Sequence, residues 1–124
     1  MRTKSALIAL SLALGAFTGP AAAQNAAAGA ATFKMRCSTC HSVTPGQRSA
    51  MGPNMVGVSG RKAASTDFNY SPALKASGLT WDAATLDRFL TAPTKVVPGT
   101  RMVIPVTDPK QRADLIAYLG SLKK

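Results

Sequence analysis

Apolar residues recur at helical spacing near both ends of the chain beyond its first 23 residues. A first helix is predicted over about residues 27–40, because Gly29, Phe33 and Cys37 form one stripe at i, i+4 and i+8. A last helix is predicted from residue 107 or 108, with Pro109 at its first position. The apolar face of that helix comprises Leu115, Ile116, Tyr118, Leu119 and Leu122.

Two shorter helices are predicted between them. One begins at Ser71-Pro72 and ends at Gly78, and the next begins at Thr80 and ends before Pro93. The second carries the apolar residues Trp81, Leu86, Phe89 and Leu90.

Residues 42–70 contain several prolines and glycines and show no clear periodicity. So long a stretch without regular structure counts against a compact domain, unless its apolar side chains pack against a bound group. The candidates for such packing are Met55, Val56, Val58 and Phe68. The pattern as a whole predicts an all-α fold of short helices and loops in a single domain over residues 24–124.

The first 23 residues have the pattern of a secretory signal peptide. Arg2 and Lys4 precede an apolar run from Ala6 to Phe17, and small residues follow as far as Ala23. The run is too short to span a membrane, although an uncleaved anchor is an alternative. Cleavage is expected near Ala23, with Ala28 as a second candidate, and it predicts export to the periplasm.

The composition of residues 24–124 adds two expectations. Of the 43 hydrophobic residues in 24–124, 15 are alanines, so few large side chains are available and something else is expected to fill the core. The same segment has 13 basic residues against five acidic ones, which predicts acidic partners or anionic surfaces. No nucleic-acid partner is expected, and the chain is expected to be a monomer without stable membrane insertion once the signal is removed.

Cys37 and Cys40 are followed by His41, the only histidine. This is the C-x-x-C-H pattern of covalent haem attachment, in which two thiols one helical turn apart bind the haem vinyl groups and the adjacent imidazole reaches the iron. A dithiol oxidoreductase site is less consistent with the sequence, because no β-rich run precedes Cys37. A zinc site lacks a fourth ligand.

A second axial ligand would have to come from elsewhere, and methionine is the common soft donor left. Met35 is too close to Cys37 in the chain, and Met51 and Met55 lie near the proximal loop. Met102, which follows the turn at residues 98–101, remains, although a methionine at such a place more often fills a gap in a core.

The sequence resembles class I cytochrome c, of the mitochondrial and soluble bacterial type, over nearly all of residues 24–124. The motifs in order are C-S-T-C-H at 37–41, G-P-N at 52–54, G-L-T-W at 78–81, P-G-T-R-M at 98–102 and D-L-I-A-Y-L at 114–119. The resemblance implies the cytochrome c fold, in which helices and loops surround one covalently bound haem c. It also implies that the terminal helices cross at Gly29.

The resemblance further implies the role of each site residue. Cys37 and Cys40 would form the thioethers, and His41 and Met102 would bind the iron. Pro53 would accept a hydrogen bond from His41 through its carbonyl. The inner haem propionate would be held by Arg61, Tyr70 and Trp81, and the remaining haem contacts would include Phe89 and Thr100. Departures from the family pattern are Phe89 in place of a tyrosine, Leu74 in place of a polar residue and Ile104 in place of an aromatic.

The implied function is one-electron transfer, because iron with two protein ligands has no open site for substrate. Partners would be membrane or periplasmic redox proteins with acidic docking patches: a cytochrome bc complex, a terminal oxidase, a reaction centre or a dehydrogenase. Arg36, Lys95 and Arg101 adjoin the haem motifs in sequence and would surround the exposed haem edge. The alternative is a peroxidase-like haem enzyme or a gas-binding protein with a labile distal ligand.

Overall fold

The computed structural model describes residues 24–124, so the predicted signal peptide and its cleavage site lie outside the described residues. Five α-helices occur in this part of the chain: α1 (Ala26–Arg36), α2 (Pro72–Ala76), α3 (Ala83–Thr91), α4 (Pro93–Val96) and α5 (Pro109–Ser121). Apart from these helices, residues 24–124 form loops and turns, with one isolated antiparallel bridge between Lys62 and Thr80. The all-α fold class is confirmed.

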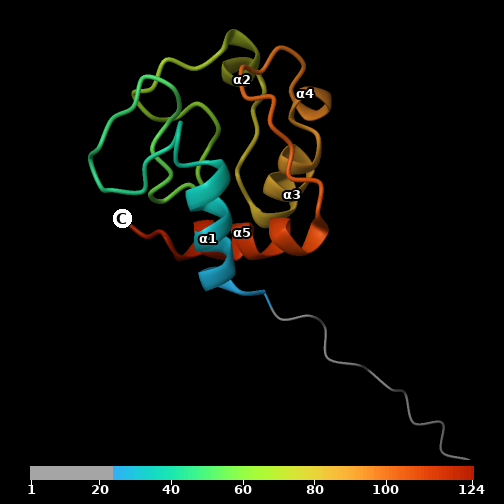
Figure 1. The fold of residues 1–124 in the computed structure, drawn as a ribbon. Coiled ribbons are helices and arrows are strands. Elements are labelled where there is room, and N and C mark those ends of the chain that lie inside the picture. The colour runs from blue at the N-terminus through green and yellow to red at the C-terminus, as the bar shows by residue number, and fades with distance from the viewer. Residues whose placement is uncertain (1–23) are drawn as a thin grey trace, which may run out of the picture.

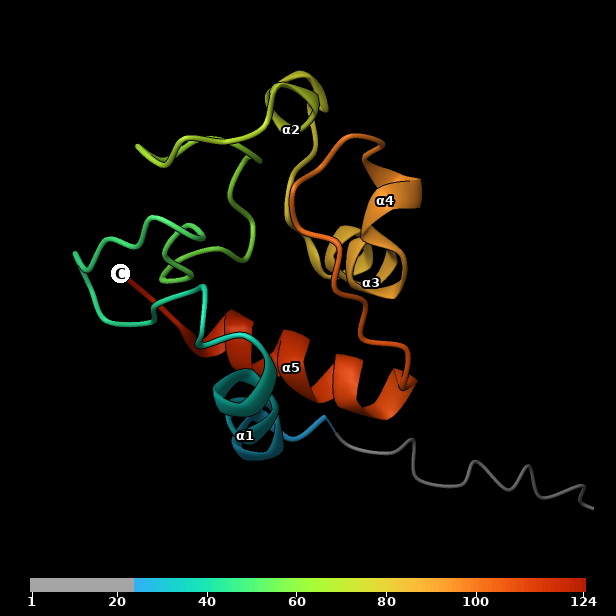
Figure 2. The same ribbon diagram turned by 45° about the horizontal axis from the view of Figure 1, so that its top comes forward.

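Helices α1 and α5 cross at one side of the molecule, and the loops of residues 42–70 lie opposite α3 and α4 (Figures 1 and 2). The crossing requires a glycine, because a Cβ atom at Gly29 would lie 2.0 Å from the main-chain oxygen of Asp114. One turn further on, the rings of Phe33 and Tyr118 pack with their centroids 5.7 Å apart. The two terminal helices therefore form one packed unit.

The hydrophobic core links this helix pair to α3, α4 and the loops. Its buried members are Phe33, Val58, Trp81, Leu86, Phe89, Leu90, Val97, Val106, Leu115 and Leu119. Val58 belongs to this core, and the partly buried Met55 packs against it. The loop is thus held partly by the protein itself.

Several helix boundaries differ from the predictions, and one of them is the end of α2, which lies at Ala76 and not at Gly78. Helix α1 ends at Arg36 and not at Cys40, because the chain turns at residues 37–40. Helix α3 begins at Ala83, since the Asp82 carboxylate caps it by accepting from the N–H of Thr85, and Trp81 therefore precedes the helix. Pro93 does not simply end α3, because it also opens the short helix α4. Helices α2 and α5 begin where predicted, after the caps Ser71 and Asp108.

No helix within residues 24–124 is long and apolar enough to cross a membrane.

Candidate functional site

The turn after α1 carries both cysteines. The N–H groups of Cys37 and Ser38 both donate to the carbonyl of Phe33, at 2.8 and 3.0 Å, and this ends the helix. Cys40 and His41 then donate to the carbonyl of Cys37, at 3.1 and 2.9 Å. Both cysteine side chains are half-buried, and they do not form a disulfide with each other. Burial raises the pKa of the Cys37 thiol, and the charge of Arg36 opposes this shift.

The imidazole of His41 is oriented through one of its two nitrogens. Nδ1 lies 2.8 Å from the carbonyl oxygen of Pro53, so Nδ1 carries the proton and donates it, because a carbonyl can only accept. Nε2 is then the unprotonated nitrogen with a lone pair for a metal. Burial lowers the pKa of His41, and the bond to Pro53 opposes this shift. The neutral, metal-binding form of the ring is therefore favoured.

Gly52 makes this arrangement possible. A Cβ atom at Gly52 would lie 2.8 Å from the carbonyl oxygen of Cys40 and 2.8 Å from Nδ1 and Cε1 of His41. No side chain fits there, so Gly52 belongs to the site. It lies in the G-P-N motif, of which only Pro53 was predicted to have a role.

Arg61 is held in place by two main-chain carbonyls. Its Nη1 donates to Val56 at 3.1 Å and its Nη2 to Asn54 at 3.1 Å. Its Nε is buried and has no partner within residues 24–124. Burial lowers the pKa of Arg61, and Tyr70 opposes this shift. An unpaired buried N–H on a cation is the donor that a haem propionate would satisfy, so the residues present fit the implied group.

Tyr70 and Trp81 are buried close to Arg61. The N–H of Trp81 donates to the carbonyl of Arg61 at 2.9 Å, and the Trp81 ring packs against Phe89 with centroids 4.9 Å apart. The Tyr70 hydroxyl lies 2.5 Å from Oγ1 of Thr66. The main chain thus joins Trp81 to Arg61, and Tyr70 lies close enough to Arg61 to affect its pKa. Thr66 was not predicted, since no motif marks it.

Met102 and Thr100 belong to the segment between α4 and α5. The N–H of Thr100 closes a turn onto Val97 at 3.0 Å, and Gly99 within that turn has φ +91°. Thr100 is buried, and Met102 is partly buried against the core. Arg101 donates to the carbonyl of Asn69 at 2.7 Å and so ties this segment to the loop that carries Tyr70.

The three basic residues predicted at the haem edge are all exposed, but they differ in their contacts. Arg36 donates to the carbonyl of Pro105 at 3.0 Å, so it and Arg101 each bridge two segments. No side-chain hydrogen bond or ion pair of Lys95 occurs within residues 24–124. Lys95 is therefore the residue of the three whose charge has no structural role.

Comparison with known proteins gives a consistent result. Residues 26–123 match the family model for cytochrome c. Cytochrome c2 of Rhodomicrobium vannielii is 50% identical over 95 residues, which cover 75% of each chain. Cytochrome c2 of Rhodoblastus acidophilus is 44% identical over 91 residues, covering 72% of this chain and 85% of the relative. The solved structure of cytochrome cH from Methylobacterium extorquens superimposes with a TM-score of 0.72 at 45% identity, covering 78% of this chain and 98% of that one.

Proposed function

The chain belongs to the cytochrome c family, and on that premise we propose that it carries single electrons in the periplasm with its haem iron held between His41 and Met102. As a member of this family it is an electron-transfer protein and not an enzyme, and it binds one haem c covalently through Cys37 and Cys40. The peroxidase-like alternative is therefore set aside. The ligand set, the compartment and the partners are the parts that we propose.

The observation that carries the ligand proposal is the hydrogen bond from His41 to Pro53. It fixes both the tautomer and the plane of the ring, and it leaves Nε2 free for iron. Gly52 has no side chain, so its backbone can lie against the ring in this orientation.

Met102 is the proposed second ligand. The turn at residues 97–100 and the tie from Arg101 to Asn69 hold its segment against the core. When bound, haem iron with His and Met ligands takes up or releases one electron at a raised potential. The aromatic and aliphatic side chains of the core would exclude water from the bound group, which would favour a small rearrangement between the two oxidation states.

The compartment and partners follow from the sequence. The segment before residue 24 predicts export, and residues 24–124 have 13 basic against five acidic residues. We therefore propose periplasmic exchange with redox proteins that present acidic surfaces, such as a cytochrome bc complex, a terminal oxidase, a reaction centre or a dehydrogenase.

The test of the ligand set is Met102→Ala in the holoprotein. Loss of the sulfur should abolish the sulfur-to-iron charge-transfer band, shift the iron toward high spin, lower the reduction potential and allow carbon monoxide to bind. Absorption spectroscopy and redox titration measure these changes. Met51→Ala is the matched control, because Met51 is exposed, and its spectrum should equal the wild type. An unchanged spectrum in Met102→Ala would show that another residue binds the iron.

A further inference from the structure

The four methionines within residues 24–124 fall into two groups by exposure. Met35 on α1 is 76% exposed, and Met51 in the following loop is 68% exposed. Met55 and Met102 are partly buried and pack against the hydrophobic core. An exposed thioether gains almost no hydrophobic stabilisation, so core packing does not explain the first pair.

The two exposed methionines flank the haem-binding segment. Met35 precedes Cys37 by two residues. Met51 directly precedes Gly52, and its N–H donates at 3.2 Å to Oγ of Ser49, which donates in turn to the carbonyl of Cys40 at 3.0 Å. Of the sulfurs in this region, those of Met35 and Met51 are the ones that a solvent-borne oxidant reaches most easily, because susceptibility follows exposure.

We propose that Met35 and Met51 are oxidation sites, at which hydrogen peroxide converts the thioether to a sulfoxide faster than at Met55 and Met102. The sulfur lone pair attacks one peroxide oxygen, so that the S–O bond forms as the O–O bond breaks. The proton of the transferred oxygen passes to the departing hydroxide, which leaves as water. The sulfur is oxidised by two electrons and the peroxide is reduced by two.

The location of each sulfur determines what oxidation does to the protein. A sulfoxide at Met35 or Met51 remains in water and disturbs no packed contact. At Met55 or Met102 it would place a polar group against apolar side chains. Methionine sulfoxide reductases reverse the change, so the exposed pair can be oxidised and restored repeatedly. This inference rests on the proposed function only through the role of Met102.

The experiment treats the holoprotein with hydrogen peroxide and follows each methionine by peptide mapping and mass spectrometry. Met35 and Met51 should gain oxygen about tenfold faster than Met55 and Met102. The double variant Met35→Leu, Met51→Leu should lose the fast phase, and the matched control Met55→Leu should keep it. Equal rates at all four positions would overturn the proposal, whether or not Met102 binds iron.

A second measurement tests the consequence. Protein oxidised only at Met35 and Met51 should keep its reduction potential and its spectrum, and reductase treatment should remove the added oxygen. A changed potential at that stage would overturn the proposal. The spectrum of Met102→Ala tests the ligand set separately, so the two failures are distinguishable.

Discussion

Among non-glycine residues in the described range 24–124, only Ala64 has positive φ, at 55°. The left-handed region costs an L residue with a Cβ roughly 1–2 kcal/mol. Ala64 lies between Arg61 and Tyr70, two residues proposed to face the haem propionate, so the strain is stored in the loop that positions them.

Ala64→Gly tests this strain. Glycine relieves the backbone cost of about 1–2 kcal/mol but loses roughly 0.5–1 kcal/mol through the entropy of the unfolded chain, so the variant should be as stable as the wild type or slightly more stable. Ala63→Gly is the control, because Ala63 has no positive φ. This variant has no strain to relieve, so its free energy of unfolding should fall by about 1 kcal/mol. Denaturant unfolding of the holoproteins measures both. If Ala64→Gly lost more stability than Ala63→Gly, the backbone at Ala64 would not be strained.

At the same scale, some site residues could be predicted from the sequence and others could not. Cys37 and Cys40, which bind the haem, form one motif with His41, the proposed iron ligand, and the chemistry of haem attachment fixes the spacing of that motif. Asn54 supports Arg61 through its main-chain carbonyl. Every residue type has this carbonyl, so the residue type at position 54 does not reveal the contact. The role of Gly52 could not be predicted from the sequence, because it depends on the close approach of the His41 ring in the folded chain.

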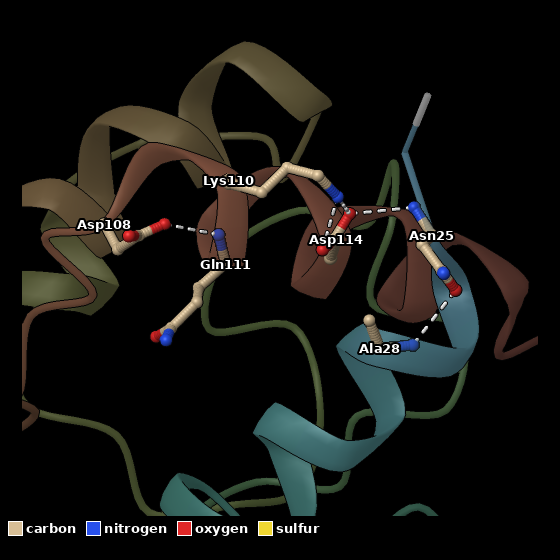
Figure 3. A network of polar contacts seen from close by, with 6 residues as sticks. All are labelled: Asn25, Ala28, Asp108, Lys110, Gln111 and Asp114. Atoms are coloured by element: carbon tan, nitrogen blue, oxygen red, sulfur yellow. Dashed lines mark hydrogen bonds and ion pairs between the residues drawn. The ribbon is translucent and has the colours of Figure 1, made fainter. Parts of the chain in front are cut away.

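Helices α1 and α5 are in contact at their crossing, and the N-terminal end of α1 is also bonded to α5. Asp114 on α5 is buried, and its carboxylate accepts from the main-chain N–H of Asn25 at 2.8 Å and from Lys110 at 2.6 and 2.7 Å (Figure 3). Asn25 in turn caps α1 by accepting from the N–H of Ala28. Cleavage after Ala28 would remove this cap, whereas cleavage after Ala23 would keep it.

Helix ends were harder to predict than helix faces, for a physical reason. The stripe of Gly29, Phe33 and Cys37 correctly marks the buried face of α1, but the same stripe continues past the end of the helix at Arg36. No proline or glycine marks that end, which is set by the turn onto the Phe33 carbonyl. Helix α4 has only four residues, too few to show periodicity.

The crossing predicts a strong effect of Gly29→Ala. The added Cβ would lie 2.0 Å from the main-chain oxygen of Asp114, so the helices must separate, at a cost on the order of 3 kcal/mol. Gly120→Ala on α5 is the matched control, because the nearest atom to its Cβ is Oγ of Ser59 at 4.0 Å. The Gly120→Ala variant should be more stable than the wild type by up to about 1 kcal/mol, because alanine has the higher helix propensity. Thermal unfolding of both variants measures the difference, and equal stabilities would refute the close approach.

The Asp114 carboxylate predicts how stability depends on pH. Hydrogen bonds from Lys110 and from the N–H of Asn25 hold the pKa of Asp114 below its ordinary value of 3.8. A carboxylate whose pKa is lowered by folding stabilises the fold fully when the pH is above its ordinary pKa. This stabilisation is lost as the pH falls through the pKa of the folded state. Asp114→Asn should therefore unfold at lower denaturant concentration near neutral pH, with a smaller further loss in acid.

The control for Asp114→Asn is Asp67→Asn. Asp67 pairs with Arg48, but both side chains are exposed, so this pair should contribute little. Denaturant midpoints measured between about pH 6 and about pH 3 give the comparison. Parallel pH curves for wild type and Asp114→Asn would show that the carboxylate is not linked to folding.

For the whole molecule, one small core holds every element. Trp81, Phe89 and Leu90 come from the region around α3, and Phe33 and Leu115 come from the terminal helices, yet all belong to one cluster. The few large side chains of a chain rich in alanine are thus concentrated in one place. Most of the basic residues in 24–124 are exposed, so the excess of positive charge produces a field outside the molecule that attracts anionic surfaces.

The last prediction concerns that charge. Rim charges mainly change the association rate, and salt screens them with a Debye length of about 8 Å near physiological ionic strength. Reversal of Arg36 or Arg101 would also break a bond to Pro105 or Asn69, so Lys95→Glu is the cleaner test. At low salt, electron transfer from a cytochrome bc complex with an acidic docking surface should slow about threefold or more in Lys95→Glu. The difference from wild type should disappear as the salt concentration rises.

Lys123→Glu, beyond the end of α5, is the matched control of equal charge change and should have a smaller effect. Stopped-flow rates over a salt series decide the matter: equal slowing in the two variants would mean that net charge alone steers the encounter and that the docking face is not at Lys95.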